Sequence, residues 1–189
     1  MVGSGPTGRL ISVVGPSGAG KDTLLSGAVA CRPALVLARR VITRPEEAGG
    51  EPYEGVSLVE FEARKSRGAF ALHWVAHGLS YGIPATFLRE MATGRTVLFN
   101  GSRAVLPRAT MLYPELAVIV VTADRATLQA RLAARGRESG LELDRRLARA
   151  EFALPEGIAH EVVDNSGSVA AGVQALVAVL DRLAADPRG

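Results

Sequence analysis

A glycine-rich segment ending in lysine carries the clearest chemical signal in the sequence. The run Gly-Pro-Ser-Gly-Ala-Gly-Lys occupies residues 15–21 and matches the phosphate-loop pattern G-x-x-x-x-G-K-[ST] up to its last position. An apolar, β-branched run precedes it and a helical pattern follows, the context in which backbone N–H groups turn toward phosphate oxygens. We therefore expect this loop to bind ATP, with the lysine reaching the β and γ phosphates. The residues in this prediction are Gly15, Pro16, Ser17, Gly18, Ala19, Gly20, Lys21, Asp22 and Thr23.

The loop departs from its pattern at residue 22, where Asp22 replaces the serine or threonine whose hydroxyl ligates Mg²⁺. One interpretation is an acid at a helix N-terminus, which the helix dipole favours. The other is a magnesium ligand, direct or through water, because a carboxylate beside a triphosphate repels it unless a cation intervenes. We favour the second interpretation. It predicts Asp22 and Thr23 as metal-binding residues, with ATP and Mg²⁺ as cofactors.

Arginines form the second set of candidate binding and catalytic residues, because the planar guanidinium group can donate paired hydrogen bonds to a phosphate. Arg is also far commoner than Lys in this chain, which a GC-rich genome would explain equally well. The position of each arginine in the predicted fold decides between phosphate binding and codon usage. Arg39, Arg40 and Arg44 come at or just past the end of a predicted strand, where open α/β sheets bind ligands.

A further group of arginines flanks a glycine-marked break between two predicted helices. A single arginine there is as well explained by a solvated surface, but two basic clusters beside one break favour a lid that acts on a phosphoryl group in transfer. Arg131, Arg135 and Arg137 come before or at the break, and Arg145, Arg146 and Arg149 follow it. Arg135 and Arg137 are the best lid candidates, whereas Arg149 is assigned to the solvated surface.

Alternating strands and helices must position these residues. Strands that alternate with helices imply a mostly parallel sheet covered on both faces, and hence the α/β class. Residues 56–76 suit a small β-rich insertion instead. The predicted strands are 10–14, 34–43, 96–100, 116–121 and 161–163, and the predicted helices are 22–30, 84–91, 102–113, 124–135, 142–152 and 169–185.

Length and composition bound the class of protein. The chain has 189 residues, 48% of them hydrophobic, which suits one domain with a real core. A net charge of +3 is too mild to argue for a nucleic-acid partner. The one cysteine, Cys31, is expected to be buried, and a single thiol fits a reducing cytoplasm. Residues 1–9 lack the apolar region of a signal peptide, and no apolar run approaches the ~18 residues of a membrane helix, so no membrane partner is expected.

The histidines carry less weight. His73 and His77 flank Trp74, and packing explains His73 adequately. No His, Cys or carboxylate cluster has the spacing of a zinc site. No nucleophile elbow supports a hydrolase.

In order and spacing, several motifs along residues 10–180 resemble guanylate kinases. They are the phosphate loop, Thr43-Arg44, Phe70 with His73, Tyr81-Gly82, and Arg131, Arg135 and Arg146. The resemblance implies that Thr43, Arg44 and Tyr81 meet the acceptor's phosphate. It also implies that Arg131, Arg135 and Arg146 act on the transferred phosphoryl group, so that together with Lys21 they form the predicted catalytic set.

The same resemblance implies a core sheet, an acceptor-binding insertion and a mobile lid. We therefore predict a P-loop NTPase three-layer fold with a parallel core sheet. One guanylate-kinase-like domain would span residues 1–189, with its core at 9–43 and 95–185, the insertion at about 44–94 and a helical lid at about 135–150.

Three departures argue against GMP as the acceptor. Leu72 stands where guanylate kinases read guanine with a glutamate, and Glu47 replaces a second phosphate-binding arginine. An Asp-x-Asp pair after the third strand is replaced by Asn100-Gly101-Ser102, followed by Arg103. A guanine without these carboxylates would leave buried N–H donors unpaired, at a cost of about 1–3 kcal/mol each.

A narrower resemblance fits better. The combination G-P-S-G-x-G-K-D, R-x-I-T-R, Trp74 to Gly82 and N-G-S-R-A is similar to the ribose 1,5-bisphosphate phosphokinase family of phosphonate degradation. That resemblance implies synthesis of 5-phosphoribosyl 1-diphosphate (PRPP) from ribose 1,5-bisphosphate and ATP, with a small sugar phosphate as partner. Loss of two acids and gain of one arginine suits an acceptor with two phosphates and no base. The predicted acceptor-binding residues are Arg40, Thr43, Arg44, Tyr81, Asn100, Ser102 and Arg103.

Two alternatives remain open at this point. One is a nucleoside monophosphate kinase with relaxed base choice. The other is a guanylate-kinase-like scaffold without catalysis, although such forms tend to lose the phosphate loop that this chain retains. A homodimer is compatible with the sequence, which does not define the oligomeric state.

Overall fold

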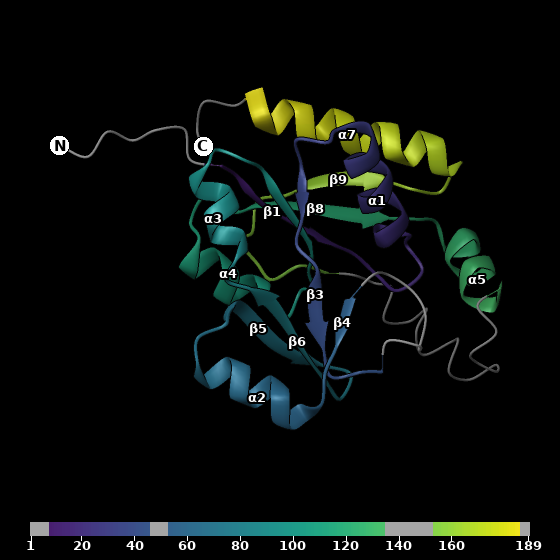
Figure 1. The fold of residues 1–189 in the computed structure, drawn as a ribbon. Coiled ribbons are helices and arrows are strands. Elements are labelled where there is room, and N and C mark those ends of the chain that lie inside the picture. The colour runs from purple at the N-terminus through teal and green to yellow at the C-terminus, as the bar shows by residue number, and fades with distance from the viewer. Residues whose placement is uncertain (1–7, 46–52, 135–152, 186–189) are drawn as a thin grey trace.

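A computed structural model of the protein, which describes residues 8–45, 53–134 and 153–185, has a parallel core sheet at its centre (Figure 1). Its five strands follow the order β2-β7-β1-β8-β9 and all pair in parallel. This confirms the α/β class. The strands are β1 (Leu10–Val14), β2 (Val36–Leu37), β7 (Val97–Asn100), β8 (Ala117–Thr122) and β9 (Glu161–Asp164).

The central strands are apolar because both of their faces are covered. In β1, Ile11 and Val13 belong to one apolar cluster, whereas Leu10 and Val14 belong to a second cluster on the opposite face. Helices supply the other side of each cluster. On the first face these are α1 (Lys21–Cys31), α5 (Arg125–Ala134) and α7 (Val169–Ala185), and on the second face α3 (Phe87–Ala92) and α4 (Leu106–Leu112).

A second sheet of four strands follows the order β4-β3-β6-β5. It is mixed, because β3 pairs in parallel with β4 and antiparallel with β6. Leu72, Trp74 and Ile83 of the β5–β6 hairpin join the second apolar cluster, so this sheet packs on the core. The strands are β3 (Arg40–Ile42), β4 (Tyr53–Gly55), β5 (Phe70–Ala76) and β6 (Leu79–Pro84).

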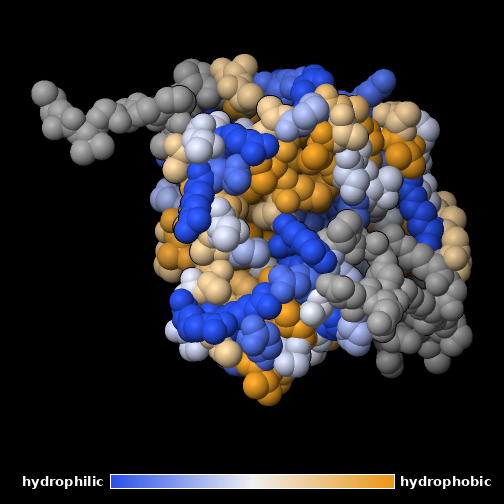
Figure 2. All heavy atoms as spheres, in the orientation of Figure 1, coloured by the Kyte–Doolittle hydropathy of each residue, from blue (hydrophilic) through white to orange (hydrophobic). Residues whose placement is uncertain are grey.

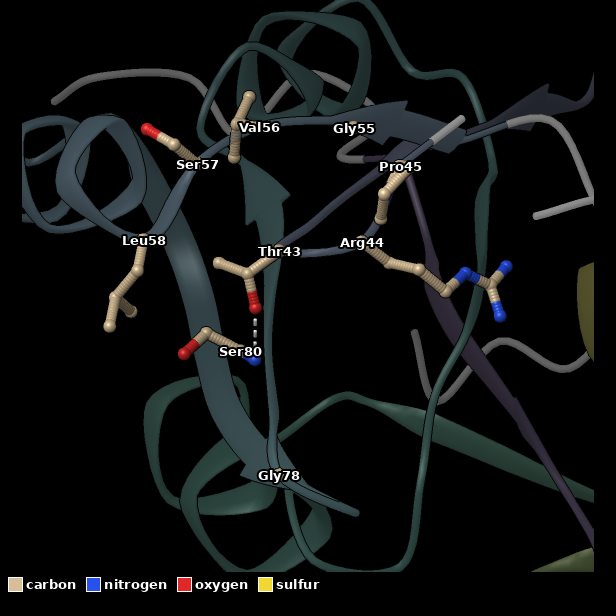
Figure 3. Close-up of a pocket in the computed structure, with 9 residues that line it drawn as sticks. All are labelled: Thr43, Arg44, Pro45, Gly55, Val56, Ser57, Leu58, Gly78 and Ser80. Atoms are coloured by element: carbon tan, nitrogen blue, oxygen red, sulfur yellow. Dashed lines mark hydrogen bonds between the residues drawn. The ribbon is translucent and has the colours of Figure 1, made fainter. Parts of the chain in front are cut away.

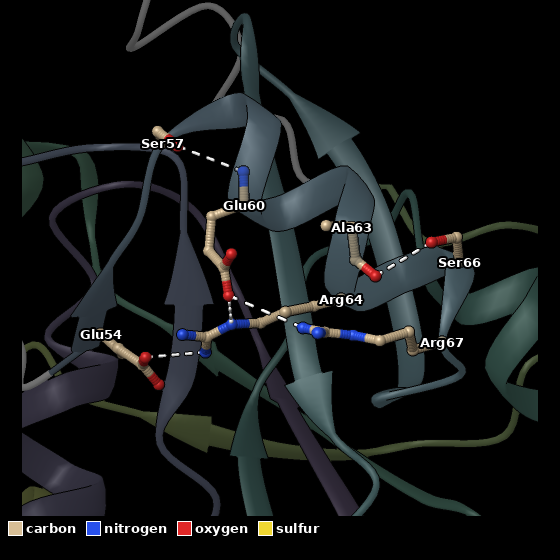
Figure 4. Close-up of polar contacts among 7 residues, drawn as sticks. All are labelled: Glu54, Ser57, Glu60, Ala63, Arg64, Ser66 and Arg67. Carbon is tan, nitrogen blue, oxygen red and sulfur yellow. Dashed lines mark hydrogen bonds and ion pairs between the residues drawn. The ribbon is translucent and has the colours of Figure 1, made fainter.

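Helix α2 (Leu58–Ser66) lies against this second sheet. Its Phe61 stacks on Phe70 of β5, with ring centroids 4.7 Å apart. Arg64 joins the helix to β4 through a 2.7 Å ion pair to Glu54, and it pairs at 2.7 Å with Glu60 within the helix (Figure 4). The hydrogen bond from Arg64 lowers the pKa of Glu60. Because these groups are solvent-exposed, the network orients α2 more than it stabilises the fold.

The surface mixes polar and apolar side chains. On the face shown in Figure 2, hydrophilic residues cover much of the second sheet and α2, and hydrophobic residues are exposed at the lower end of this region. The exposed apolar side chains of α2 include Leu58 and Val59. No helix within the described part of the chain is long and apolar enough to cross a membrane.

The structure corrects the strand predicted at 34–43. That segment forms two short strands in different sheets: β2 pairs with β7 in the core, and β3 pairs with β4 and β6 in the second sheet. A β-rich run does not reveal which sheet it joins, because pairing is decided by residues far away in the sequence.

One smaller prediction was incomplete and two were wrong. Residues 56–76 contain strand β5 of the second sheet, as a β-rich insertion requires, but also helix α2, which Ser57 caps by accepting a hydrogen bond from the Glu60 N–H. Pro84 ends strand β6, and the helix predicted from it begins at Phe87 instead. Cys31 is exposed at the end of α1 and not buried. The predicted helix at 142–152 lies outside the described residues.

Candidate active site

The phosphate loop connects the end of β1 to the start of α1. Gly20 has a left-handed backbone (φ 87°, ψ 19°), and a Cβ there would lie 2.5 Å from Nδ2 of Asn165. A Cβ on Gly15 would lie 2.2 Å from the Val121 carbonyl oxygen. Both positions therefore require glycine. Lys21 Nζ donates hydrogen bonds of 2.9 Å to the carbonyls of Gly15 and Pro16, which places its charge across the loop.

A cleft of about 250 Å³, the phosphate-loop cleft, opens beside this loop. The loop and the first turn of α1 line one side of it, including Lys21 and Asp22. The predicted acceptor residues that line it come from three segments far apart in the sequence: Arg40 of β3, Tyr81 of β6, and Asn100 with Ser102 at the end of β7. The structure thus brings the predicted ATP loop and four predicted acceptor residues to one cavity.

Tyr81 is held between two neighbours. Strand β6 lies between β3 and β5, so Arg40 approaches the tyrosine from one side and Trp74 from the other. The Trp74 ring stacks on it at 5.3 Å with an interplanar angle of 7°, and Arg40 Cζ lies 5.5 Å from its ring centroid. Burial lowers the pKa of Arg40, and the nearby Asp22 opposes this shift. Arginine stays charged under such shifts, so the cleft wall keeps a cation.

Asp22 contacts the end of the third predicted strand directly. Its Oδ1 accepts a hydrogen bond from Asn100 Nδ2, and the Asn100 carbonyl accepts a 3.1 Å hydrogen bond from Arg40 Nη1. Asp22 and Thr23 both line the cleft and offer the oxygen ligands that a hard cation prefers. The described residues contain no group of three His, Cys, Asp or Glu that would hold a metal. A cation here would therefore complete its shell with phosphate oxygens and water, as Mg²⁺ usually does.

Arg131 of α5 reaches the phosphate loop. Its Nη1 lies 3.6 Å from the position that a Cβ on Gly20 would occupy. This nitrogen is buried and has no hydrogen-bond partner within the part of the chain that the structure describes. Of the three arginines predicted to act on the phosphoryl group, one is thus placed at the loop. Arg135 and Arg146 lie outside the described residues.

Thr43 and Arg44 line a second cavity, which we call the outer pocket. It has a volume of about 530 Å³ (Figure 3). Thr43 Oγ1 accepts a 2.9 Å hydrogen bond from the Ser80 N–H. Arg44 Nε donates a 3.0 Å hydrogen bond to the Tyr53 hydroxyl, and its Cζ lies 4.4 Å from the Tyr53 ring centroid. The outer pocket is lined by Thr43, Arg44, Pro45, Gly55, Val56, Ser57, Leu58, Gly78 and Ser80.

The predicted acceptor residues therefore divide between two cavities. Arg40, Tyr81, Asn100 and Ser102 line the phosphate-loop cleft, and Thr43 and Arg44 line the outer pocket. Arg103, in the turn after β7, is half-buried and lines neither cavity.

Sequence reasoning missed Asn165. This residue follows β9 and is only 2% exposed, and its Nδ2 donates a 2.7 Å hydrogen bond to the Ala19 carbonyl of the phosphate loop. Its signal in the sequence is a polar residue just past the last strand, at the same sheet edge as the loop. Trp74 and His77 were noted but not assigned to the site, and both line the phosphate-loop cleft.

A short polar network joins the start of α5 to the segment after β9. Asp124 Oδ1 accepts a 2.7 Å hydrogen bond from the Thr127 N–H, which caps α5 and lowers the pKa of Asp124. The Asp124 N–H donates a 2.8 Å hydrogen bond to Ser166 Oγ. The helix that carries Arg131 and the segment that carries Asn165 are thereby held together beside the loop.

Known structures share this architecture. The guanylate kinase from Anaplasma phagocytophilum aligns with a TM-score of 0.71 over 97% of this chain and 89% of that one, at 16% identity. A gluconokinase from Sinorhizobium meliloti aligns with a TM-score of 0.51 at 19% identity, covering 95% of each chain. At such identities the likeness concerns the fold alone, and it confirms the P-loop kinase fold predicted from the sequence.

Sequence relatives are much closer. No family model matches the chain. The ribose 1,5-bisphosphate phosphokinase PhnN of Ruegeria sp. (strain TM1040) is 54% identical over 177 residues, covering 92% of both chains. The enzyme of the same name from Pseudomonas fluorescens (strain SBW25) is 47% identical over 184 residues, covering 92% of this chain and 95% of the relative. The chain therefore belongs to the ribose 1,5-bisphosphate phosphokinase (PhnN) family.

Proposed function

We propose that the protein transfers the γ-phosphoryl group of ATP to the 1-phosphate of ribose 1,5-bisphosphate. The products are ADP and 5-phosphoribosyl 1-diphosphate. Family membership supports the reaction, and one observation carries the assignment of the site: the phosphate loop faces Arg40, Tyr81 and Asn100 across a single cleft.

Phosphoryl transfer requires that the acceptor be positioned in line with the γ-phosphate and that the negative charge of the phosphates be neutralised. An ionised oxygen of the acceptor's 1-phosphate attacks the γ-phosphorus, and the bond from that phosphorus to the β,γ-bridging oxygen breaks, leaving its electrons on ADP. Because the attacking oxygen carries no proton, no general base is required. Lys21 and Arg131 neutralise charge on the group in transfer, and Arg40 and Tyr81 hold the acceptor in line.

Mg²⁺ is the cation that we propose for this site. Asp22 and Thr23 would hold it, directly or through water, beside the phosphate loop. When bound, the metal supplies positive charge to the β and γ phosphates. The hydrogen bond from Asn100 fixes the Asp22 carboxylate in the cleft.

The buried position of Leu72 supports a sugar phosphate over a nucleotide as acceptor. Leu72 stands where guanylate kinases read guanine, and here its side chain is fully buried in the core beside Trp74 and Ile83. An apolar, filled position offers no partner to the N–H donors of a base. The intact phosphate loop, with Lys21 placed across it, in turn favours an enzyme over a scaffold.

Product analysis tests this function. Purified protein is incubated with MgATP and ribose 1,5-bisphosphate and followed by ³¹P NMR. We expect the 1-phosphate signal to be replaced by the coupled pair of a diphosphate ester, while the 5-phosphate signal persists. A diphosphate at the 5-position, or ADP release without a diphosphate ester, would contradict the proposal.

A further inference from the structure

The turn that joins β5 to β6 contains a residue that the fold alone does not explain. His77 and Gly78 form a two-residue connection, with φ of 51° and 74°. Hairpin turns with positive φ at both positions favour Asn-Gly or Gly-Gly, whose residues adopt this conformation at least cost. His77 is the only residue other than glycine with positive φ in the described part of the chain. An unfavourable backbone position is a reason to look for a function of its side chain.

The side chain of His77 does not stabilise the turn through polar contacts. Its imidazole makes no hydrogen bond or ion pair with any residue that the structure describes, and the residue is exposed. His77 instead lines the phosphate-loop cleft, together with Ser17 and Lys21 of the loop. An imidazole in this cleft is free to donate a hydrogen bond to an anionic ligand.

The tip of the hairpin stands between the two cavities. Whereas His77 lines the phosphate-loop cleft, the next residue, Gly78, lines the outer pocket, where Figure 3 shows it at the end of the hairpin. Tyr81, four residues after His77 on the same hairpin, also lines the cleft. His77 therefore belongs to the acceptor side of the cleft, across from the loop that binds ATP.

We infer that His77 binds the acceptor, by donating a hydrogen bond from its imidazole to the sugar phosphate that receives the phosphoryl group. The inference rests on the proposed function. Among the residues that the structure describes, the cleft is lined by two cationic side chains, Lys21 and Arg40, and by one acidic side chain, Asp22. An acceptor with two phosphates carries more negative charge than a nucleoside monophosphate, and a further donor on the acceptor side suits it. The histidine thus occupies a turn position that asparagine would fill at lower conformational cost.

The test replaces His77 by Gly, which tolerates a left-handed backbone, leaves the turn intact and carries no side-chain donor. His77→Asn also keeps the turn but retains an N–H donor, so it is the conservative variant. Steady-state KM values are measured for ribose 1,5-bisphosphate and for ATP, with kcat and the unfolding temperature alongside. In His77→Gly we expect the acceptor KM to rise about tenfold, the size that loss of one hydrogen bond to a charged group produces, while the ATP KM changes less than about twofold. In His77→Asn the rise in the acceptor KM should be smaller. The unfolding temperature of either variant should equal or exceed that of the wild type.

Val75→Thr is the matched control, because Val75 is an exposed residue of the same hairpin and does not line the cleft. It should leave both KM values unchanged. An unchanged acceptor KM in His77→Gly, or a rise confined to the ATP KM, would overturn the inference. If the wild type itself does not phosphorylate ribose 1,5-bisphosphate, the proposed function fails, and this inference with it. If the wild type phosphorylates ribose 1,5-bisphosphate and the variants have its acceptor KM, only the role of His77 is ruled out and the proposed function stands.

Discussion

The side-chain amide of Asn165 donates a 2.7 Å hydrogen bond to the backbone carbonyl of Ala19. In a planar trans peptide the C=O and N–H groups point in opposite directions. Holding the Ala19 carbonyl toward Asn165 therefore directs the N–H of Gly20 to the other side of the peptide. The left-handed backbone of Gly20 leads directly into α1, so this N–H joins the donors at the helix N-terminus that phosphates use. The residue just past the last strand thus sets the orientation of a peptide in the phosphate loop.

Asn165→Ala should weaken ATP binding and lower stability. The Ala19 carbonyl loses its buried partner, which costs about 1–3 kcal/mol of unfolding free energy, and the Gly20 N–H loses its fixed direction. We expect the KM for ATP to rise about tenfold, because one hydrogen bond to a charged group is weakened. Val163→Ala, which truncates a buried side chain in the strand that Asn165 follows, should lower stability without raising the ATP KM. Equal effects of the two variants on the ATP KM would show that Asn165 acts through stability alone.

Asp22→Asn should change the metal dependence of turnover. An amide at this position keeps a similar shape and loses the negative charge that attracts a divalent cation. We expect the Mg²⁺ concentration for half-maximal activity to rise about tenfold, a loss of about 1.4 kcal/mol in metal binding. Activity is measured against free Mg²⁺ at fixed saturating ATP. An unchanged Mg²⁺ dependence would rule out Asp22 as a residue that holds the metal.

Arg131→Ala should slow the transfer step. The guanidinium lies beside Gly20 with a buried nitrogen whose hydrogen bond no described residue accepts, so a phosphate oxygen is its natural partner. We expect kcat to fall about a hundredfold, the scale of removing one group that stabilises charge in a transition state. Arg125→Ala, at the exposed start of the same helix, provides the comparison and should have near-normal kcat. Similar kcat values for the two variants would contradict the role of Arg131.

The cap of α5 should make a pH-dependent contribution to stability. Hydrogen bonds from Thr127 lower the pKa of Asp124, so the folded state binds its proton less readily than the unfolded chain. The stabilisation is fully present above the unfolded pKa of about 3.9 and is lost as pH falls through the folded pKa. Asp124→Ala should therefore lower the unfolding temperature at pH 7 and at pH 5, with a difference that shrinks below about pH 4. A difference that stays constant down to pH 3 would argue against the carboxylate as its source.

Local patterns made the core and the loop predictable. β1, β7 and β8 are continuous apolar runs because both of their faces are buried, and the phosphate loop is a contiguous motif. The division of the acceptor residues was not predictable in this way. Arg40 and Arg44 are four residues apart, yet they line different cavities because Arg40 begins β3 and Arg44 lies past its end.

Long-range contacts hid other parts of the site. The hydrogen bond between Asn165 and Ala19 joins residues 146 positions apart, and no local pattern encodes it. Strand β2 has two residues, too few to display an alternation of its own, so it merged with β3 in the predicted strand 34–43. The place of His77 depends on the hairpin that brings it to the cleft.

An ADP-release assay run in parallel on ribose 1,5-bisphosphate, ribose 5-phosphate, GMP and AMP, each with MgATP, tests the choice of acceptor most directly. We expect rapid ADP release with ribose 1,5-bisphosphate and slow release with the other three. Lys21→Ala, which removes the charge that lies across the phosphate loop, should abolish the signal, whereas Lys65→Ala, on the exposed surface of α2, should not. Rapid phosphorylation of GMP with no response to ribose 1,5-bisphosphate would show that the protein is a nucleoside monophosphate kinase instead.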